Sequence, residues 1–273
     1  MILNIRNLSF SYGKEPLLRD LSLTADKGEI VCLLGPNGSG KTTLLDCVLG
    51  FCRTFSGDVT LCGKDILKCS RPQLAETAAY VPQNHSPTFP YTVHEIVLMG
   101  RTARTGLFGA PGKEDHAVCS EALRRVGLAS FSERPYTSLS GGELKLVMLA
   151  RALAQQTPLI LLDEPTSSLD FKNELLFLET LSDLVKSDGL AVLMATHALN
   201  HPFYFESKGL PVRAVMLQKG KAAKCGTPSE LLTPQTLFSV YGVHATVQET
   251  TDAAGRTVRT IAVLGSDGKD ETE

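Results

Sequence analysis

The octapeptide GPNGSGKT, at residues 35–42, limits this 273-residue chain to a small set of folds. It matches the pattern G-x-x-x-x-G-K-[ST] and lies between an apolar run at 29–34 and a segment of helical character at 41–49. In that context the glycines let backbone N–H groups turn toward a β-phosphate, and the helix N-terminus adds the positive end of its dipole. We expect Lys41 to neutralise β- and γ-phosphate charge, and Thr42 to offer its hydroxyl to Mg²⁺. The sequence therefore predicts a nucleotide site rather than a glycine-rich turn.

The rest of the chain has the pattern of an α/β core with a helical insertion. Apolar and polar residues alternate at 2–10 and 21–23, which predicts antiparallel strands near the N-terminus. From about residue 86 to 156, apolar side chains recur at i, i+3, i+4 and i+7, which predicts helices. Solid apolar runs predict buried strands on both sides of this block, at 29–34, 159–162 and 190–195, with a further short strand at 59–61. Such an order predicts an α/β core with an inserted helical subdomain.

Composition excludes several classes of protein. The chain is 43% apolar, enough for a sizeable core, and its net charge of −2 does not predict a nucleic-acid partner. Seven scattered cysteines include no CxxC and no histidine at zinc spacing, which favours free thiols in a reducing cytosol. The first residues do not resemble a signal peptide, and no run of 18 apolar residues occurs. We expect a soluble chain whose polar, acidic end, GSDGKDETE, is disordered.

Two acidic residues, Asp163 and Glu164, follow one of the predicted buried strands in PLILLDEPTSSLD. Open α/β sheets bind ligands where their strands end, so Asp163 is a candidate to hold Mg²⁺ through water. Glu164 is a candidate to orient and deprotonate an attacking water. Pro165 disfavours helical geometry at Glu164, which favours a carboxylate held at the strand end. A pair of solvated acids is the alternative, and it is less favoured in a chain that also has a phosphate loop.

Several motifs, in one order, resemble those of the ATP-binding subunit of an ABC transporter. They are FSYG, GPNGSGKTT, YVPQ, LSGGE, LILLDEP, SSLD and TH, and the resemblance covers about residues 1–244. It implies an ABC-type P-loop NTPase fold with a RecA-like α/β core, an N-terminal antiparallel β subdomain and the helical subdomain at about 86–156. Residues 245–273 would then be a C-terminal extension.

The resemblance also implies roles for individual residues. Tyr12 would stack on adenine, although without the family context a packed aromatic residue is an equal alternative. Gln83 would contact Mg²⁺ or water and sense a membrane partner, and His197 would contact the γ-phosphate. Asp170 would belong to a loop that crosses to a partner subunit, and Ser140, Gly141 and Gly142 would form the signature. The phosphate loop would bind ATP through Gly35, Pro36, Asn37, Gly38, Ser39, Gly40, Lys41, Thr42 and Thr43.

The signature explains why one chain has two phosphate-binding turns. In such proteins two copies pack head to tail around two ATP molecules, so that the signature of one copy faces the nucleotide held by the other. The signature usually ends in glutamine, whereas this chain has Glu143. Ser140-x-x-Glu143 also fits a capping box, a local structural role that is compatible with the functional one. The glutamate places an extra negative charge near a nucleotide.

The segment YTVHEIVLMGRTARTGLFGAPGKED resembles ATPases that import metal chelates, such as siderophore iron, haem and cobalamin, and the related molybdate systems. The resemblance implies an Mg-dependent, ATP-hydrolysing subunit peripheral to the cytoplasmic face of the cell membrane. Its partners would be a second copy, a separate permease and, indirectly, an extracytoplasmic binding protein. We expect the loops near Gln83 and at 101–108 to face the permease. An exporter ATPase and a soluble ABC protein without a transport role are the alternatives.

Overall fold

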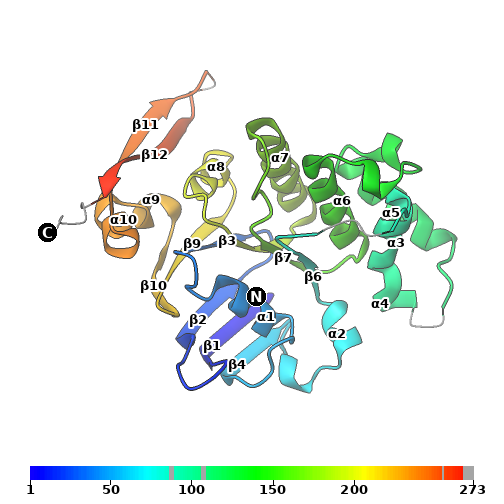
Figure 1. Ribbon diagram of the computed structural model, residues 1–273, viewed down its shortest axis with the longest axis horizontal. Helices are drawn as coiled ribbons and strands as arrows, with labels where there is room; N and C mark the ends of the chain where they lie inside the picture. The colour runs from blue at the N-terminus through cyan, green and yellow to red at the C-terminus, as the bar shows by residue number, and fades with distance from the viewer. Residues whose placement is uncertain (86–88, 106–108, 254, 267–273) are drawn as a thin grey trace, which may run out of the picture.

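Two β-sheets and a group of helices form the protein. A computed structural model describes residues 1–85, 89–105, 109–253 and 255–266. The antiparallel sheet has the strand order β2-β1-β4-β5, and its strands are β1 (Leu3–Phe10), β2 (Leu18–Ala25), β4 (Ser56–Leu61) and β5 (Lys64–Asp65). The alternation of apolar residues near the N-terminus therefore predicted β1 and β2 correctly. Figure 1 shows this sheet as one layer beneath a second, mostly parallel sheet.

The parallel sheet has the strand order β10-β9-β3-β8-β7-β6. Its strands are β3 (Ile30–Leu34), β6 (Ala78–Val81), β7 (Leu159–Asp163), β8 (Ala191–Ala195), β9 (Val212–Gln218) and the antiparallel edge strand β10 (Lys221–Gly226). Every residue of β3, β7 and β8 is buried, because both faces of the sheet are covered. This double coverage explains why these strands are continuous apolar runs in the sequence.

Helix α1 (Lys41–Val48) fills the space between the two sheets, where Leu44, Leu45 and Val48 join one hydrophobic core. Helices α3 (Val93–Leu98), α5 (Lys113–Arg125), α6 (Gly141–Ala154) and α7 (Phe171–Asp188) share a second core with the other face of the parallel sheet. The short helices α2 (Arg71–Ala75) and α4 (Thr102–Thr105) flank this group. In the described ranges, every helix is too short or too polar to cross a membrane.

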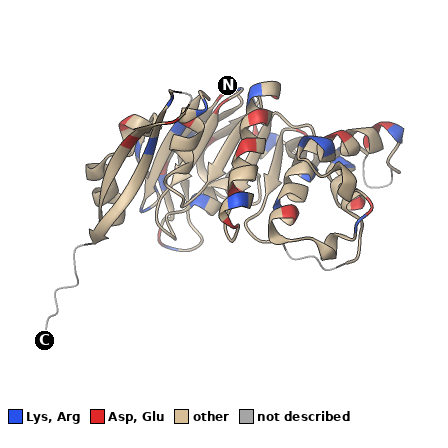
Figure 2. Ribbon diagram, turned by 90° about the horizontal axis from the view of Figure 1, so that it is seen from above, with Lys and Arg blue, Asp and Glu red and all other residues tan. Residues whose placement is uncertain are grey.

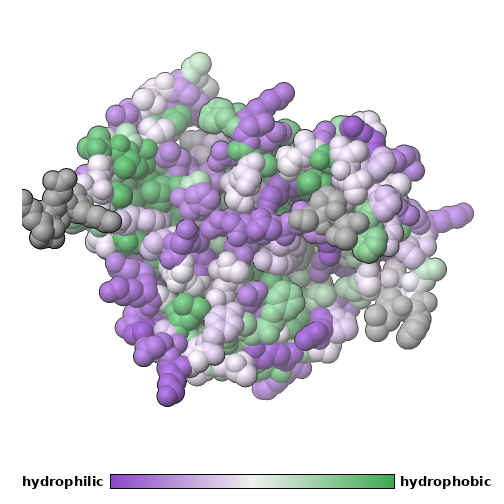
Figure 3. Space-filling view, viewed as in Figure 1, coloured by the Kyte–Doolittle hydropathy of each residue, from purple (hydrophilic) through white to green (hydrophobic). Residues whose placement is uncertain are grey.

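The C-terminal part adds α8 (His201–Ser207), α9 (Pro228–Leu231), α10 (Pro234–Tyr241) and the hairpin of β11 (Val243–Thr251) and β12 (Thr257–Ser266). The hairpin lies beside α8 and α10 (Figure 1), and in Figure 3 apolar side chains gather over α10 and the hairpin base. Gly265 and Ser266 lie in β12, so the expectation of disorder is wrong for these two residues; 267–273 lie outside the described residues.

The segment expected to face the permease contains a buried arginine. Arg101 is only 4% exposed, and its guanidinium donates 2.8 Å hydrogen bonds to Asp115 Oδ1, Ala154 O and Gln156 Oε1. These contacts tie the turn between α3 and α4 to α5 and to the end of α6. The expectation that Arg101 faces a partner is therefore wrong, because its charge is neutralised inside the helical group. Residues 106–108 of the same segment lie outside the described residues.

Candidate functional site

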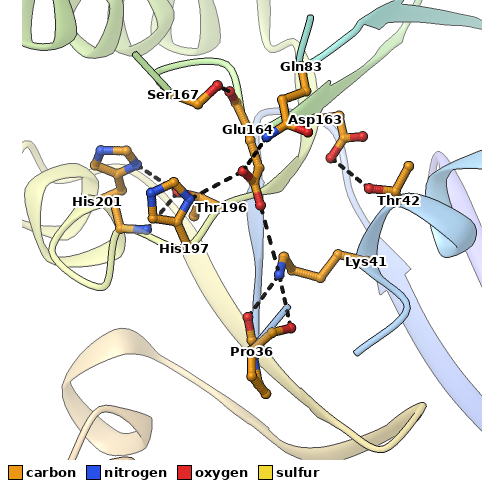
Figure 4. A network of polar contacts seen from close by, with 12 residues as sticks. Pro36, Lys41, Thr42, Gln83, Asp163, Glu164, Ser167, Thr196, His197 and His201 are labelled. Atoms are coloured by element: carbon orange, nitrogen blue, oxygen red, sulfur yellow. Dashed lines mark hydrogen bonds and ion pairs between the residues drawn. The ribbon is translucent and has the colours of Figure 1, made fainter. Parts of the chain in front are cut away.

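The parallel register gathers the predicted site residues at one edge of the sheet. Leu33 and Asp163 both pair with Ala195, and Val81 pairs with Leu162. The carboxyl ends of β3, β6, β7 and β8 therefore meet, and the segment after each strand carries a predicted site residue. Figure 4 shows these side chains converging on Glu164.

The loop between β3 and α1 has the backbone that its glycines predict. Gly38 and Gly40 have φ of +76° and +97°, a region that L side chains rarely adopt. The hydroxyl of Ser39 is buried and has no hydrogen-bond partner in the described part of the chain. Together with Leu17, Gln83 and Glu164, residues 37–43 line an open cavity of about 390 Å³. An unpaired buried hydroxyl and a turn of backbone donors fit the oxygen atoms of a nucleotide phosphate.

Lys41 lies at the floor of this cavity. Its ammonium donates to Gly35 O at 2.8 Å and lies 4.0 Å from Glu164 Oε1. Burial lowers the pKa of Lys41, and the carboxylates of Glu164 and Asp163 oppose that shift. The ammonium lines the cavity together with the backbone of the loop, so it is placed to contact an anion bound there.

Thr42 and Asp163 face each other beside the loop. Thr42 Oγ1 donates to Asp163 Oδ1 at 3.2 Å, and Tyr80 OH lies 3.4 Å from Asp163 Oδ2. Burial raises the pKa of Asp163, while the hydroxyl of Thr42 partly opposes that shift. Hydroxyl and carboxylate oxygens are ligands that Mg²⁺ prefers, so this pair of side chains fits the ion.

Glu164 is surrounded by donors from three segments. Gln83 Nε2 donates to Glu164 Oε2 at 2.8 Å, and His197 Nδ1 lies 3.3 Å from the same oxygen. The backbone of Glu164 has φ of +44°, in the left-handed region rather than the extended region that a following proline favours, and its N–H donates to Ala195 O at 2.9 Å. A strained backbone at this position holds the carboxylate toward the cavity.

Other predicted residues lie outside this cluster. Ser140, Gly141 and Gly142 begin α6 and do not line the phosphate cavity, and Asp170 caps α7 by accepting from Asn173 N at 2.8 Å. Ser140, Gly141 and Asp170 are exposed on the surface. Tyr12 is 69% exposed, and its hydroxyl lies 3.6 Å from Cys52 Sγ, just beyond α1. These placements leave the three groups free to meet ligands or partners outside the cavity.

Sequence reasoning missed four residues near this cluster. Leu17 lines the cavity, Tyr80 contacts Asp163, Ser167 Oγ donates to Glu164 O at 2.8 Å, and Lys145 Nζ donates to Gln83 O. Tyr80, the first residue of the YVPQ motif, and Ser167, the first residue of the SSLD motif, had a signal in the sequence, whereas Leu17 and Lys145 had none. A second cavity, of about 670 Å³, lies at the opposite edge of the sheet and contains none of the predicted site residues.

A phosphate loop between a parallel strand and a helix, with carboxylates at the end of another strand of the same sheet, defines a P-loop NTPase. A family model described as ABC transporter matches residues 18–167. The chain is 38% identical over 245 residues to the iron(3+)-hydroxamate import ATP-binding protein FhuC of Bacillus subtilis, covering 90% of this chain and 89% of that protein. It is also 36% identical to the molybdate import ATP-binding protein MolC of Haemophilus influenzae, over 88% of this chain and 87% of that protein.

A solved metal-chelate type ABC transporter, in an inward-facing conformation, superposes with a TM-score of 0.83 at 32% identity, over 96% of this chain and 97% of the other. The protein belongs to the ABC transporter family, and it has the fold of that family's ATP-binding subunits.

Proposed function

We propose that this chain is the Mg²⁺-dependent ATPase subunit of an importer that takes up a metal chelate or related cargo. The observation that carries the proposal is the arrangement of Lys41, Gln83 and His197 around the carboxylate of Glu164. The names of the similar ATPases, which import iron(3+)-hydroxamate and molybdate, favour import and this class of cargo.

The residues of the site divide into those that would bind ATP and Mg²⁺ and one that would accept a proton. Lys41 and the backbone of the loop would bind the β- and γ-phosphates of ATP. Thr42 and Asp163 would hold Mg²⁺, with Gln83 close by, and the ion would neutralise phosphate charge when bound. Glu164 would accept the proton of the attacking water, while the amide of Gln83 keeps the carboxylate oriented. His197 would contact the γ-phosphate.

The positions of the signature residues and of Asp170 support a dimer of two copies of this chain. Ser140 and Asp170 are exposed and do not share the cavity of their own chain, so a second copy would bring its signature to the phosphates bound here. Phe171, next to Asp170, is 84% exposed, which favours a covered surface in the assembled state.

A groove beside Gln83 is the proposed contact with the permease. It has a volume of about 370 Å³ and is lined by apolar residues, including Phe51 and Tyr80, and by Arg71, His85 and Arg151. Phe51 is 63% exposed, and Arg151 donates no hydrogen bond in the described ranges, so an apolar segment carrying an acidic residue would fit. In the view of Figure 2, charged residues of both signs occur along the length of the molecule, and one helix in the middle carries several acidic residues in succession. The protein would then bind peripherally at the cytoplasmic face of the membrane through this permease.

Purified protein tests the ATPase directly. Wild-type protein should release phosphate from ATP only when Mg²⁺ is present. Lys41→Ala should lose most ATP binding and nearly all turnover, because several phosphate charges would lack compensation. Lys14→Ala, in the exposed turn before β2, is the matched control and should behave as wild type. Wild-type turnover by Lys41→Ala would disprove the assignment.

A further inference from the structure

Behind His197 lies a buried hydrogen-bonded group that the proposed chemistry does not use. His201 is 3% exposed; its Nε2 lies 2.5 Å from Glu174 Oε1, and its Nδ1 lies 3.1 Å from Thr196 Oγ1. Thr196 follows β8, His201 begins α8 and Glu174 lies in the first turn of α7. One imidazole therefore joins three elements, and Figure 4 shows it beside His197 and Thr196.

The direction of each hydrogen bond follows from the partners. A carboxylate only accepts, so Nε2–H of His201 donates to Glu174. Burial lowers the pKa of His201 and outweighs the opposing effect of Glu174, so the ring is neutral at pH 7 and Nδ1 is an acceptor. The Thr196 hydroxyl then donates to Nδ1 and accepts from the Ala198 N–H at 3.1 Å. In this arrangement each of these donors has an acceptor.

These hydrogen bonds involve Thr196 and Ala198, the two neighbours of His197 in the chain. The backbone N–H groups on its two sides are both fixed, since Thr196 N donates to Leu33 O at 3.0 Å and Ala198 N donates to Thr196 Oγ1. The imidazole of His197 itself is 60% exposed, so packing cannot fix its position. Its distance of 3.3 Å from Glu164 Oε2 therefore depends on the backbone that carries it.

We propose that His201 is a positioning residue, which acts through Thr196 to keep His197 beside Glu164. The proposal rests on the proposed function, in which His197 and Glu164 face the γ-phosphate. Glu174 extends the link to α7, because Glu174 N donates to the carbonyl of the cap residue Asp170 at 2.9 Å. His201 thus connects the helix that starts at the partner-facing Asp170 with the loop that carries His197.

Two near-isosteric variants of Thr196 test the link. Thr196→Val removes the hydroxyl and nearly preserves the volume, whereas Thr196→Ser keeps the hydroxyl. Thr196→Val should lower kcat on the order of tenfold, within the hundredfold that a 1 Å misplacement costs, with the KM for ATP and the melting temperature little changed. Thr196→Ser should restore most of kcat. Equal kcat in Thr196→Val and wild type, or equal losses in both variants, would overturn the proposal.

A double-mutant cycle separates positioning from general destabilisation. In a His197→Ala background, Thr196→Val should lower kcat no further, because the side chain being positioned is absent. An additive loss would assign Thr196 and His201 a structural role only. His201→Gln, which keeps a donor toward Glu174 but lacks the ring, should resemble Thr196→Val in this cycle.

Histidine-selective ¹⁵N NMR gives a readout that needs no turnover. Wild-type His201 should be the Nε2–H tautomer, and Thr196→Val should shift the His197 ring signals while Thr196→Ser leaves them in place. A wild-type protein without ATPase activity would refute the proposed function, and this spectrum would still decide the positioning role. Unchanged His197 signals in Thr196→Val would overturn it.

Discussion

The carboxylate of Glu143 accepts a hydrogen bond from the backbone N–H of Ser140 at 2.7 Å, and the hydroxyl of Ser140 lies 3.4 Å from Glu143 N. The two residues form a reciprocal cap at the start of α6. The negative charge that distinguishes this signature is thus directed back to its own helix N-terminus, where the helix dipole favours it. Arg134 Nη1, 4.0 Å from Glu143 Oε1, screens it further.

Glu143→Gln should make the protein slightly less stable at neutral pH. The backbone N–H of Ser140 lowers the pKa of Glu143, so its stabilising contribution is fully present above the unfolded-state pKa and is lost as pH falls through the folded-state pKa. Chemical denaturation at pH 7 should show a loss of a few tenths of a kcal/mol, and the difference should vanish in acid. A difference that is the same at both pH values would show that the charge of Glu143 does not contribute to it.

Arg101 and Arg104 should respond differently to charge reversal. Arg101→Glu places a carboxylate at a buried position beside Asp115 and removes three hydrogen bonds, so it should clearly lower the free energy of unfolding. Arg104→Glu should cost much less, since Arg104 is exposed and reaches the carbonyls of Gln155 and Gln156 at 3.3 and 3.2 Å. Urea denaturation measures both. Similar, small losses would mean that Arg101 is not structural.

Sequence reasoning succeeded where the signal is local and failed where it depends on distant contacts. Lys41 and Thr42 are placed by one continuous strand–loop–helix motif, and Asp163 by the apolar strand before it. Lys145 contacts Gln83 across 62 residues of sequence, and nothing in its helical pattern indicates that partner. Arg101 was misassigned because charge usually predicts exposure, whereas here Asp115 and two oxygens of other residues compensate the charge.

Tyr12 should affect ATP affinity more than turnover. Its ring is 69% exposed and stands edge-on to Phe10, with centroids 4.8 Å apart, so one face is available to a base. Stacking is present in ground and transition states alike, so Tyr12→Ala should raise KM about fivefold, equivalent to about 1 kcal/mol, with kcat little changed. Tyr12→Phe keeps the ring and should resemble wild type. A large loss of kcat at saturating ATP would instead make Tyr12 structural.

Lys145 should affect turnover through Gln83. Its ammonium donates to the backbone carbonyl of Gln83, and the side-chain amide of Gln83 donates to Glu164. Lys145→Met should therefore lower kcat on the order of tenfold while ATP binding persists, because the amide would lose its orientation. Lys145→Arg keeps the charge and a donor and should recover much of the rate. Steady-state kinetics would refute this role if the methionine variant matched wild type.

The last prediction concerns the ATP-dependent dimer. If each nucleotide lies between the loop of one copy and the signature of the other, ATP joins the copies and hydrolysis releases them. Glu164→Gln keeps the shape of the side chain but cannot accept the proton, so it should trap the closed state. In size-exclusion chromatography, Glu164→Gln should elute as a dimer with ATP and as a monomer with ADP.

A second substitution locates the clamp at the signature. Adding Ser140→Arg should abolish the dimer, because a bulky side chain at this exposed helix start would occupy the space of the partner's γ-phosphate. ATP binding to each monomer should survive, since residues 35–42 are untouched. Ser140→Thr keeps the capping hydroxyl and is the control.

The charge of Glu143 is tested separately. If this charge weakens the contact between the signature and the partner's nucleotide, Glu143→Gln should strengthen the dimer, whereas the same change at Glu95, in the equivalent cap of α3, should not. A Glu164→Gln, Glu143→Gln protein that stays monomeric with bound ATP would refute the two-site role of residues 140–142.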